Sequence, residues 1–191
     1  MTLAAPEAQR SRTILDAARR VFEQYGVRRA NVEDVARVAG VSRSTLYRRF
    51  PTKDALLEAV LLQQYDEFLT ELDTLAADLA PQRAVVECFV RGLALTREIP
   101  LLARLTESEP ELITGMGSGS HAGLIRVATE RVSATLRRSG ATMPDEDLRE
   151  VAELLLRVAY SYLLNTSGSL DVGDADAVRR YAERRLAPMV L

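Results

Sequence analysis

Apolar residues recur three or four positions apart along almost the whole chain, and this spacing restricts the fold to packed helices. Ile14, Ala18, Val21, Phe22 and Tyr25 illustrate the spacing, because they fall on one face of a helix that ends at Gly26. No segment shows the convincing alternation of apolar and polar residues that is typical of a half-buried strand. We therefore expect an all-α chain of about nine helices, the later ones at residues 32–39, 43–50, 53–78, 82–97, 100–107, 121–138, 145–166 and 174–187.

Charge is distributed unevenly along the 191 residues. Residues 1–55 contain eleven basic and six acidic side chains, whereas the remaining 136 contain 14 basic and 21 acidic ones. A basic head on an acidic body favours a polyanionic partner at the N-terminal end. A solvated surface with an uneven distribution of charges explains the same numbers equally well.

Composition limits the location and the chemistry of the chain. Cys88 is the one cysteine, so the chain forms no internal disulfide. The sequence has neither an apolar run of membrane-spanning length nor a secretory signal at its start, and we expect a cytoplasmic protein outside the membrane. His121 is the one histidine, so we expect no histidine-based metal site and no cofactor.

Residues 31–50 contain the most informative pattern, which is two short helical segments joined by a glycine turn. Asn31 and Ser42 are residue types that cap helix N-termini, and Gly40 provides a residue without a side chain where the chain reverses. Leu46 is expected to face inward. The pattern predicts a helix-turn-helix in which one face of the second helix stays exposed.

That exposed face carries basic and hydroxyl side chains. A helix fits the major groove of DNA, where its first residues meet base edges and basic side chains meet phosphates. We expect base contacts from Arg43, Ser44 and Thr45, because an arginine can pair bidentately with guanine. We expect phosphate contacts from Asn31, Tyr47, Arg48, Arg49 and Lys53.

At these residues the chain resembles the TetR/AcrR family of transcriptional regulators. The resemblance covers about residues 10–60 and consists of the turn Ala39-Gly40-Val41-Ser42, the run Thr45-Leu46-Tyr47-Arg48-Arg49-Phe50, and Lys53. Ser44 stands where Gly or Pro is common and Arg49 where His is common, which leaves the operator sequence open. The resemblance implies a DNA-binding domain at residues 1–52 and a helical effector-binding and dimerisation domain at residues 53–191.

The resemblance also implies a homodimer formed by the last two helices. Apolar stripes on these helices support it, although both stripes could instead be used inside one subunit. The residues predicted for the interface are Leu148, Ala152, Leu155, Ala159, Tyr162, Val178, Ala182 and Leu186. By the same analogy, a small apolar or amphipathic effector is expected to contact Cys88, Phe89, Leu93, Leu105, Met116, His121, Ile125, Tyr160 and Leu164.

The function implied is that of a repressor, not an enzyme, which leaves an inverted-repeat operator when its effector binds. Two other classes stay open. One is an adaptor whose helix-turn-helix binds protein, which the arginine-rich face disfavours. The other is a helical enzyme that holds Mg²⁺ on acids such as Asp145, Glu146, Asp147, Glu150 and Glu153. The helix macrodipole already favours acids at a helix start, so these residues have a simpler explanation.

Overall fold

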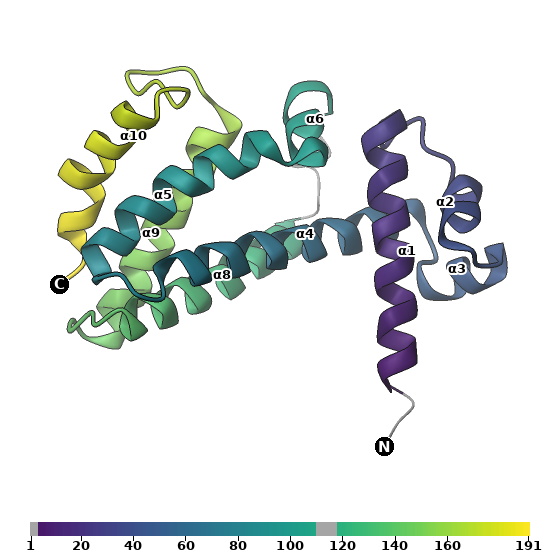
Figure 1. Cartoon of the computed structure of the whole chain (residues 1–191), viewed down its shortest axis with the longest axis horizontal. Coiled ribbons are helices and arrows are strands. Elements are labelled where there is room, and N and C mark those ends of the chain that lie inside the picture. The colour runs from purple at the N-terminus through teal and green to yellow at the C-terminus, as the bar shows by residue number, and fades with distance from the viewer. Residues whose placement is uncertain (1–3, 110–117) are drawn as a thin grey trace. The chain divides into compact units, whose positions relative to one another are not determined.

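The computed structural model describes residues 4–109 and 118–191, and every regular element in these two ranges is helical (Figure 1). The nine α-helices in these ranges are α1 (Ala4–Tyr25), α2 (Val32–Ala39), α3 (Arg43–Arg49), α4 (Lys53–Ala76), α5 (Pro81–Glu98), α6 (Pro100–Ser108), α8 (Ser118–Arg138), α9 (Asp145–Leu164) and α10 (Ala175–Tyr181). The expectation of an all-α chain is thus confirmed. Within the described residues, no helix combines the length and the apolar composition needed to cross a membrane.

The observed helix bounds differ most from the expected ones at the C-terminal end. The last helix, expected to reach residue 187, ends at Tyr181 and is followed by a π-helical turn (Ala182–Leu186) and a 3-10 turn (Ala187–Met189). Pro188 lies in the 3-10 turn and has no backbone N–H to donate. A regular α-helix therefore cannot continue unchanged through this position.

The contacts divide the chain into two units, of which the first ends at Glu67 and the second begins at Phe68. The helix α4 contributes to both. The part of α4 that belongs to the first unit is tied to α1, because Gln63 Nε2 donates a hydrogen bond to Asp16 Oδ1 at 2.9 Å and Arg19 pairs with Glu67 at 3.5 Å. The domain boundary that we expect from the sequence lies before α4 and stays a prediction.

The helix α1 provides the largest buried side chains of the first unit. Its Ile14 and Phe22 are at most 1% exposed, and Leu46 of α3 and Leu56 of α4 are fully buried with them in the core. Burying such a side chain contributes about 1.5–3 kcal/mol. Tyr25, expected on the same face of α1, is instead 45% exposed because it stands at the last residue of the helix.

The core of the second unit forms where α5 contacts α9 and α10. Three aromatic rings meet there. Phe89 of α5 stacks on Tyr181 of α10 with ring centroids 6.1 Å apart, and it meets Tyr162 of α9 edge-on at 6.5 Å. Such pairs add about 0.5–1.5 kcal/mol to the burial of their area.

The apolar stripes of α9 and α10, whose residues are predicted for the dimer interface, pack into this core. The members that are at most 8% exposed are Leu148, Ala152, Leu155, Val178, Ala182 and Leu186. Ala159 and Tyr162 are half-buried and pack against the same cluster. The two helices turn these side chains inward because they cover α5 of their own subunit. The homodimer itself stays a prediction.

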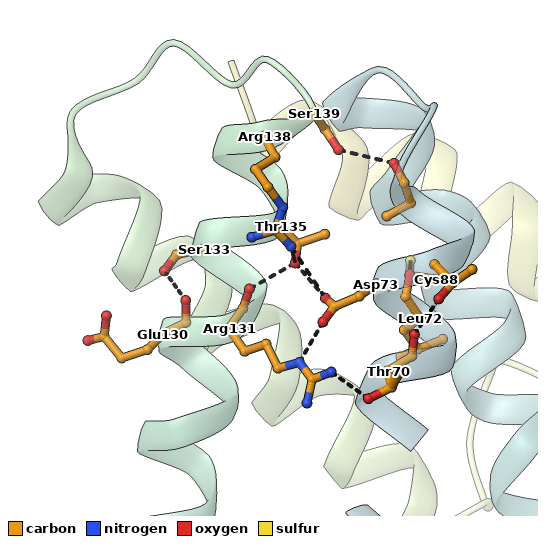
Figure 2. Close-up of polar contacts among 12 residues, drawn as sticks. Thr70, Leu72, Asp73, Cys88, Glu130, Arg131, Ser133, Thr135, Arg138 and Ser139 are labelled. Atoms are coloured by element: carbon orange, nitrogen blue, oxygen red, sulfur yellow. Dashed lines mark hydrogen bonds and ion pairs between the residues drawn. The ribbon is translucent and has the colours of Figure 1, made fainter. Parts of the chain in front are cut away.

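A polar cluster joins α4 to α8 within the second unit (Figure 2). Arg131 Nε donates to Asp73 Oδ2 at 2.5 Å, and Thr135 Oγ1 donates to Asp73 Oδ1 at 2.5 Å. Arg131 Nη2 also donates to Thr70 Oγ1 at 2.7 Å. The side chains of Asp73 and Arg131 are only 25% and 26% exposed, so each charge has lost much of its water and depends on its partner. We call these four residues the Asp73 cluster.

A second ion pair joins α5 to α10. Arg179 donates from Nη1 and Nη2 to the two carboxylate oxygens of Glu87, at 2.6 and 2.9 Å. Arg83 lies one turn before Glu87 on α5 and pairs with it at 2.5 Å. The Arg179 hydrogen bond, against the opposing effect of burial, lowers the pKa of Glu87 below its ordinary value.

Candidate nucleic-acid interface

The turn between α2 and α3 is built by three local devices. The Asn31 side chain caps α2 by accepting a hydrogen bond from Glu33 N at 3.0 Å. Gly40 ends α2 in the left-handed conformation, with φ 66° and ψ 30°. Its N–H donates to Arg37 O at 3.3 Å, and the next N–H, that of Val41, donates to Ala36 O at 3.0 Å. These two hydrogen bonds satisfy carbonyl groups in the last turn of α2 and fix where α3 begins.

Only one side chain of α3 is buried. Leu46 is fully covered, whereas Arg43, Ser44, Tyr47, Arg48 and Arg49 are exposed. The sequence-predicted base and phosphate residues of α3 therefore lie together on a short helix whose other face holds it to the domain. Thr45, predicted to contact a base, is half-buried.

Hydroxyl groups converge at the N-terminus of α3. Ser42 Oγ caps the helix by accepting a hydrogen bond from Thr45 N at 3.2 Å. The same oxygen lies 3.0 Å from Ser44 Oγ and 2.9 Å from Thr45 Oγ1, and either atom of each pair could be the donor. The Thr45 hydroxyl is therefore engaged within the turn, while its backbone position is fixed by the cap.

The basic side chains near α3 are paired to different extents. Arg43 forms an ion pair with Glu33 of α2, yet its side chain remains 65% exposed. Arg49 lies 3.5 Å from Glu7 of α1. Arg48 has no ion pair among residues 4–109 and 118–191. Glu33 could not be singled out from its sequence position, because an acid in the first turn of a helix is already explained by the macrodipole.

A neighbouring pair on α2 is purely local. Arg37 Nη2 donates to Asp34 Oδ1 at 2.7 Å, three residues earlier on the same helix. The hydrogen bond raises the pKa of the Arg37 guanidinium, which stays charged in any case. Asp34 thus resembles Glu33 in charge and position, but it pairs with an arginine outside α3.

Lys53, predicted to contact a phosphate, is the first residue of α4, and its ammonium group lies against the loop between α1 and α2. Its Nζ donates to the backbone oxygens of Arg28 and Ala30, at 3.0 and 2.9 Å. The adjacent start of α4 is capped by Thr52, whose Oγ1 accepts a hydrogen bond from Ala55 N at 3.0 Å. An ammonium group has three donors, so one proton remains for another acceptor.

The residues predicted for the effector pocket are distributed over α5, α6, α8 and α9. Phe89, Leu93 and Leu105 are buried, Cys88, Ile125 and Tyr160 are half-buried, and Leu164 is 41% exposed. Met116 and the side chain of His121 lie outside the described residues. Burial raises the pKa of the Cys88 thiol to about 11, and Cys88 Sγ donates to Leu72 O at 3.5 Å, as expected of an unreactive thiol. The pocket stays a prediction.

Two of the five acids considered for Mg²⁺ have arginine partners. Asp145 pairs with Arg137 at 2.5 Å, and Glu153 pairs with Arg157 at 2.6 Å. In the part of the chain that the structure describes, no group of three or more His, Cys, Asp or Glu side chains is arranged to hold a metal ion.

Comparison with known proteins agrees with this geometry. The model of the bacterial regulatory proteins of the tetR family matches residues 14–60, which contain α2, α3 and the start of α4. The transcriptional regulator UidR of Escherichia coli K12 is 30% identical over 166 residues, which cover 82% of each chain. The chain belongs to the TetR family.

Other similarities are narrower. The regulator RutR of E. coli K12 is 38% identical over 96 residues, which are 50% of this TetR-family chain but only 45% of RutR. The chain therefore spans less than half the length of RutR in this match. The crystal structure of the repressor AlkX from Dietzia sp. strain DQ12-45-1b has a TM-score of 0.66 at 22% identity, with 90% of this chain and 94% of AlkX covered. At that identity it supports the fold alone.

Proposed function

We propose that this chain is a DNA-binding transcriptional regulator that reads a duplex with α3. The observation that carries the proposal is the division of α3 into one buried side chain, Leu46, and an exposed face with three arginines. A helix held in this way enters the major groove without disturbing the domain that supports it. UidR and RutR are both named as transcriptional regulators of the helix-turn-helix type. Such a role belongs in the cytoplasm of a bacterium.

Selection from a random duplex library tests the proposal. The full chain should enrich an inverted-repeat sequence, because two copies of α3 reach successive major grooves about 34 Å apart. Arg43→Ala should weaken binding to the selected duplex by about 1–3 kcal/mol and relax the preference at one base pair of each half-site. Arg37→Ala, which removes a guanidinium from α2 but not from α3, is the matched control. Failure to enrich any sequence would overturn the proposal.

The regulator acts as a homodimer in this proposal, and an exposed apolar side chain of α9 allows a direct test of the interface. Leu154 of α9 is 45% exposed, whereas Val151 and Val158, beside it at helical spacing, are half-buried against the core of the same unit. Light scattering should give twice the chain mass of 21.1 kDa. Leu154→Glu should return the mass to that of one chain, and an unchanged mass would exclude this face.

Repression and its release are the final part of the proposal. The family analogy favours repression over activation, and the structural neighbour AlkX is named as a repressor. A small apolar or amphipathic effector that binds the second unit shifts α4, the one helix shared by both units, so that two copies of α3 no longer fit the operator together. A coupling of about 1–3 kcal/mol gives a 5- to 150-fold loss of affinity. Compounds that stabilise the protein against heat but leave operator affinity unchanged would contradict the coupling.

A further inference from the structure

The carboxylate of Glu33 links the first turn of α2 to the first turn of α3. Glu33 Oε1 pairs with Nη2 of Arg43, the first residue of α3. Both backbone positions are fixed, since Glu33 N is bound by the Asn31 cap and α3 is capped by Ser42. The pair therefore does not depend on a flexible loop. In the absence of DNA, the pair favours one position of the guanidinium.

The pair leaves Arg43 available to a second partner. Its side chain is 65% exposed, whereas that of Glu33 is 37% exposed, so the arginine lies on the solvent side of the pair. A guanidinium has five N–H groups in one plane, and a carboxylate on one of them leaves an edge that matches guanine O6 and N7. Holding the plane in one orientation reduces the rotamer freedom that a base contact must otherwise remove.

The carboxylate also has an unfavourable effect on DNA binding. A negative charge beside α3 repels the phosphates of every duplex, and it neutralises part of the attraction that Arg43 contributes without regard to sequence. Only a duplex that offers Arg43 a good base contact offsets this repulsion. A fixed repulsive group of this kind increases the difference in affinity between right and wrong sequences.

We propose that Glu33 is a specificity-determining residue of this interface, which orients Arg43 toward a base and penalises duplexes on which Arg43 finds no partner. The inference rests on the proposed DNA-binding function and adds to it a residue of α2 that does not itself read a base. It predicts opposite effects of Glu33 on specific and non-specific DNA.

Asp34 provides a matched control on the next position of α2. It is also a first-turn carboxylate, its side chain is 38% exposed, and it pairs with Arg37 at 2.7 Å instead of with α3. Glu33→Gln and Asp34→Asn each remove one negative charge with little change of shape. Neither residue is the N-cap of α2, so both variants keep the cap at Asn31.

The experiment measures the affinity of the full chain for a duplex selected from a random library and for a scrambled duplex of the same composition. Glu33→Gln should bind the scrambled duplex several-fold tighter and lose on the order of five- to tenfold of the ratio between the two affinities. Asp34→Asn should strengthen both interactions alike and keep the ratio. In an Arg43→Ala background, Glu33→Gln should no longer change the ratio.

Two results would overturn the inference while the proposed function stands. One is an unchanged ratio for Glu33→Gln in a protein whose wild type clearly selects a sequence. The other is an equal change of the ratio in the Arg43→Ala background. A wild-type chain that selects no sequence overturns the proposed function itself, and the inference with it, so the two failures are distinguishable.

Discussion

Arginines have different surroundings in the two units of this chain. In the first unit, Arg43 is 65% exposed and pairs with a single carboxylate, and Arg48 is exposed beside it. In the second unit, Arg131 is 26% exposed and donates to both Asp73 and Thr70 (Figure 2). Arg43 and Arg48 are thus available to an outside partner, whereas Arg131 is committed to contacts within its own unit.

Burial of the acidic partner distinguishes an arginine that holds the fold together from one that stays available to an outside partner. Asp73 and Glu87 are 25% and 19% exposed, and each receives at least two donors. A buried carboxylate without its arginine is an uncompensated charge. An exposed pair such as Arg49–Glu7 can open at little cost, since water and salt replace the partner.

The largest expected effect is that of salt concentration, which should change DNA affinity far more than it changes the stability contributed by the Asp73 cluster. With Arg48, Arg49 and Lys53 on phosphates in each copy of a dimer, raising the salt from about 50 to about 200 mM should lower DNA affinity on the order of a thousandfold. The Asp73 cluster should respond far less, because half-buried pairs are poorly screened. Fluorescence anisotropy and chemical unfolding at the same salt concentrations measure the two responses. A flat salt dependence of DNA binding would contradict the phosphate contacts.

Removing one arginine from each unit should change the free energy of unfolding much more in the second unit than in the first. Arg131→Ala should lower the free energy of unfolding by about 2 kcal/mol, because it leaves the half-buried Asp73 with only the more distant Arg138, at 3.9 Å, as a charge partner. Arg48→Ala should change that free energy by less than about 0.5 kcal/mol, as is usual for an exposed surface residue. Urea unfolding followed by circular dichroism measures both. Equal losses would show that exposure does not separate the two uses.

Lys53 combines both uses, since it is a cation of the first unit whose ammonium group already donates to internal acceptors. Lys53→Ala should lower the free energy of unfolding by about 1 kcal/mol through the loss of its hydrogen bonds to Arg28 and Ala30. It should also weaken selected and scrambled duplexes alike, if the remaining proton reaches a phosphate. Thermal unfolding and binding assays on one preparation separate the two effects. Lower stability with unchanged DNA affinity would remove Lys53 from the phosphate contacts.

Lowering the pH should produce the smallest of these effects on stability, because only the carboxylate of Glu87 is considered. Arg179 lowers the pKa of Glu87 from its ordinary value near 4.5, so the folded state holds the ionised form more strongly than the unfolded state does. Stability from this group is therefore complete above that ordinary value and is lost as the pH falls through the lowered one. Glu87→Gln should lose less stability than wild type on acidification, and parallel curves would contradict the assignment.

The interface was predictable from sequence wherever its determinants are local. Asn31, Gly40 and Ser42 perform the capping and turning roles that their positions indicate, because each acts on backbone groups within three or four residues. Leu46 is buried as its spacing predicts. Local chemistry of this kind does not depend on what the rest of the chain does.

Partner choice between distant helices was not predictable. The apolar stripe of α9 was correctly placed on one face, but periodicity does not say whether that face meets its own subunit or another. Asp73 and Arg131 are 58 residues apart, and the many acids and arginines of this chain offer no rule for pairing them. Glu33 and Arg43 meet only because the left-handed turn at Gly40 sets the direction of α3.

Since α3 has only Leu46 buried, its outward positions are nearly independent of folding stability. Mutation can therefore explore new duplex preferences at these sites while the domain keeps its melting temperature. The same separation makes the helix a convenient cassette: residues grafted there from a relative should redirect the regulator to that relative's promoter without any repacking of the scaffold.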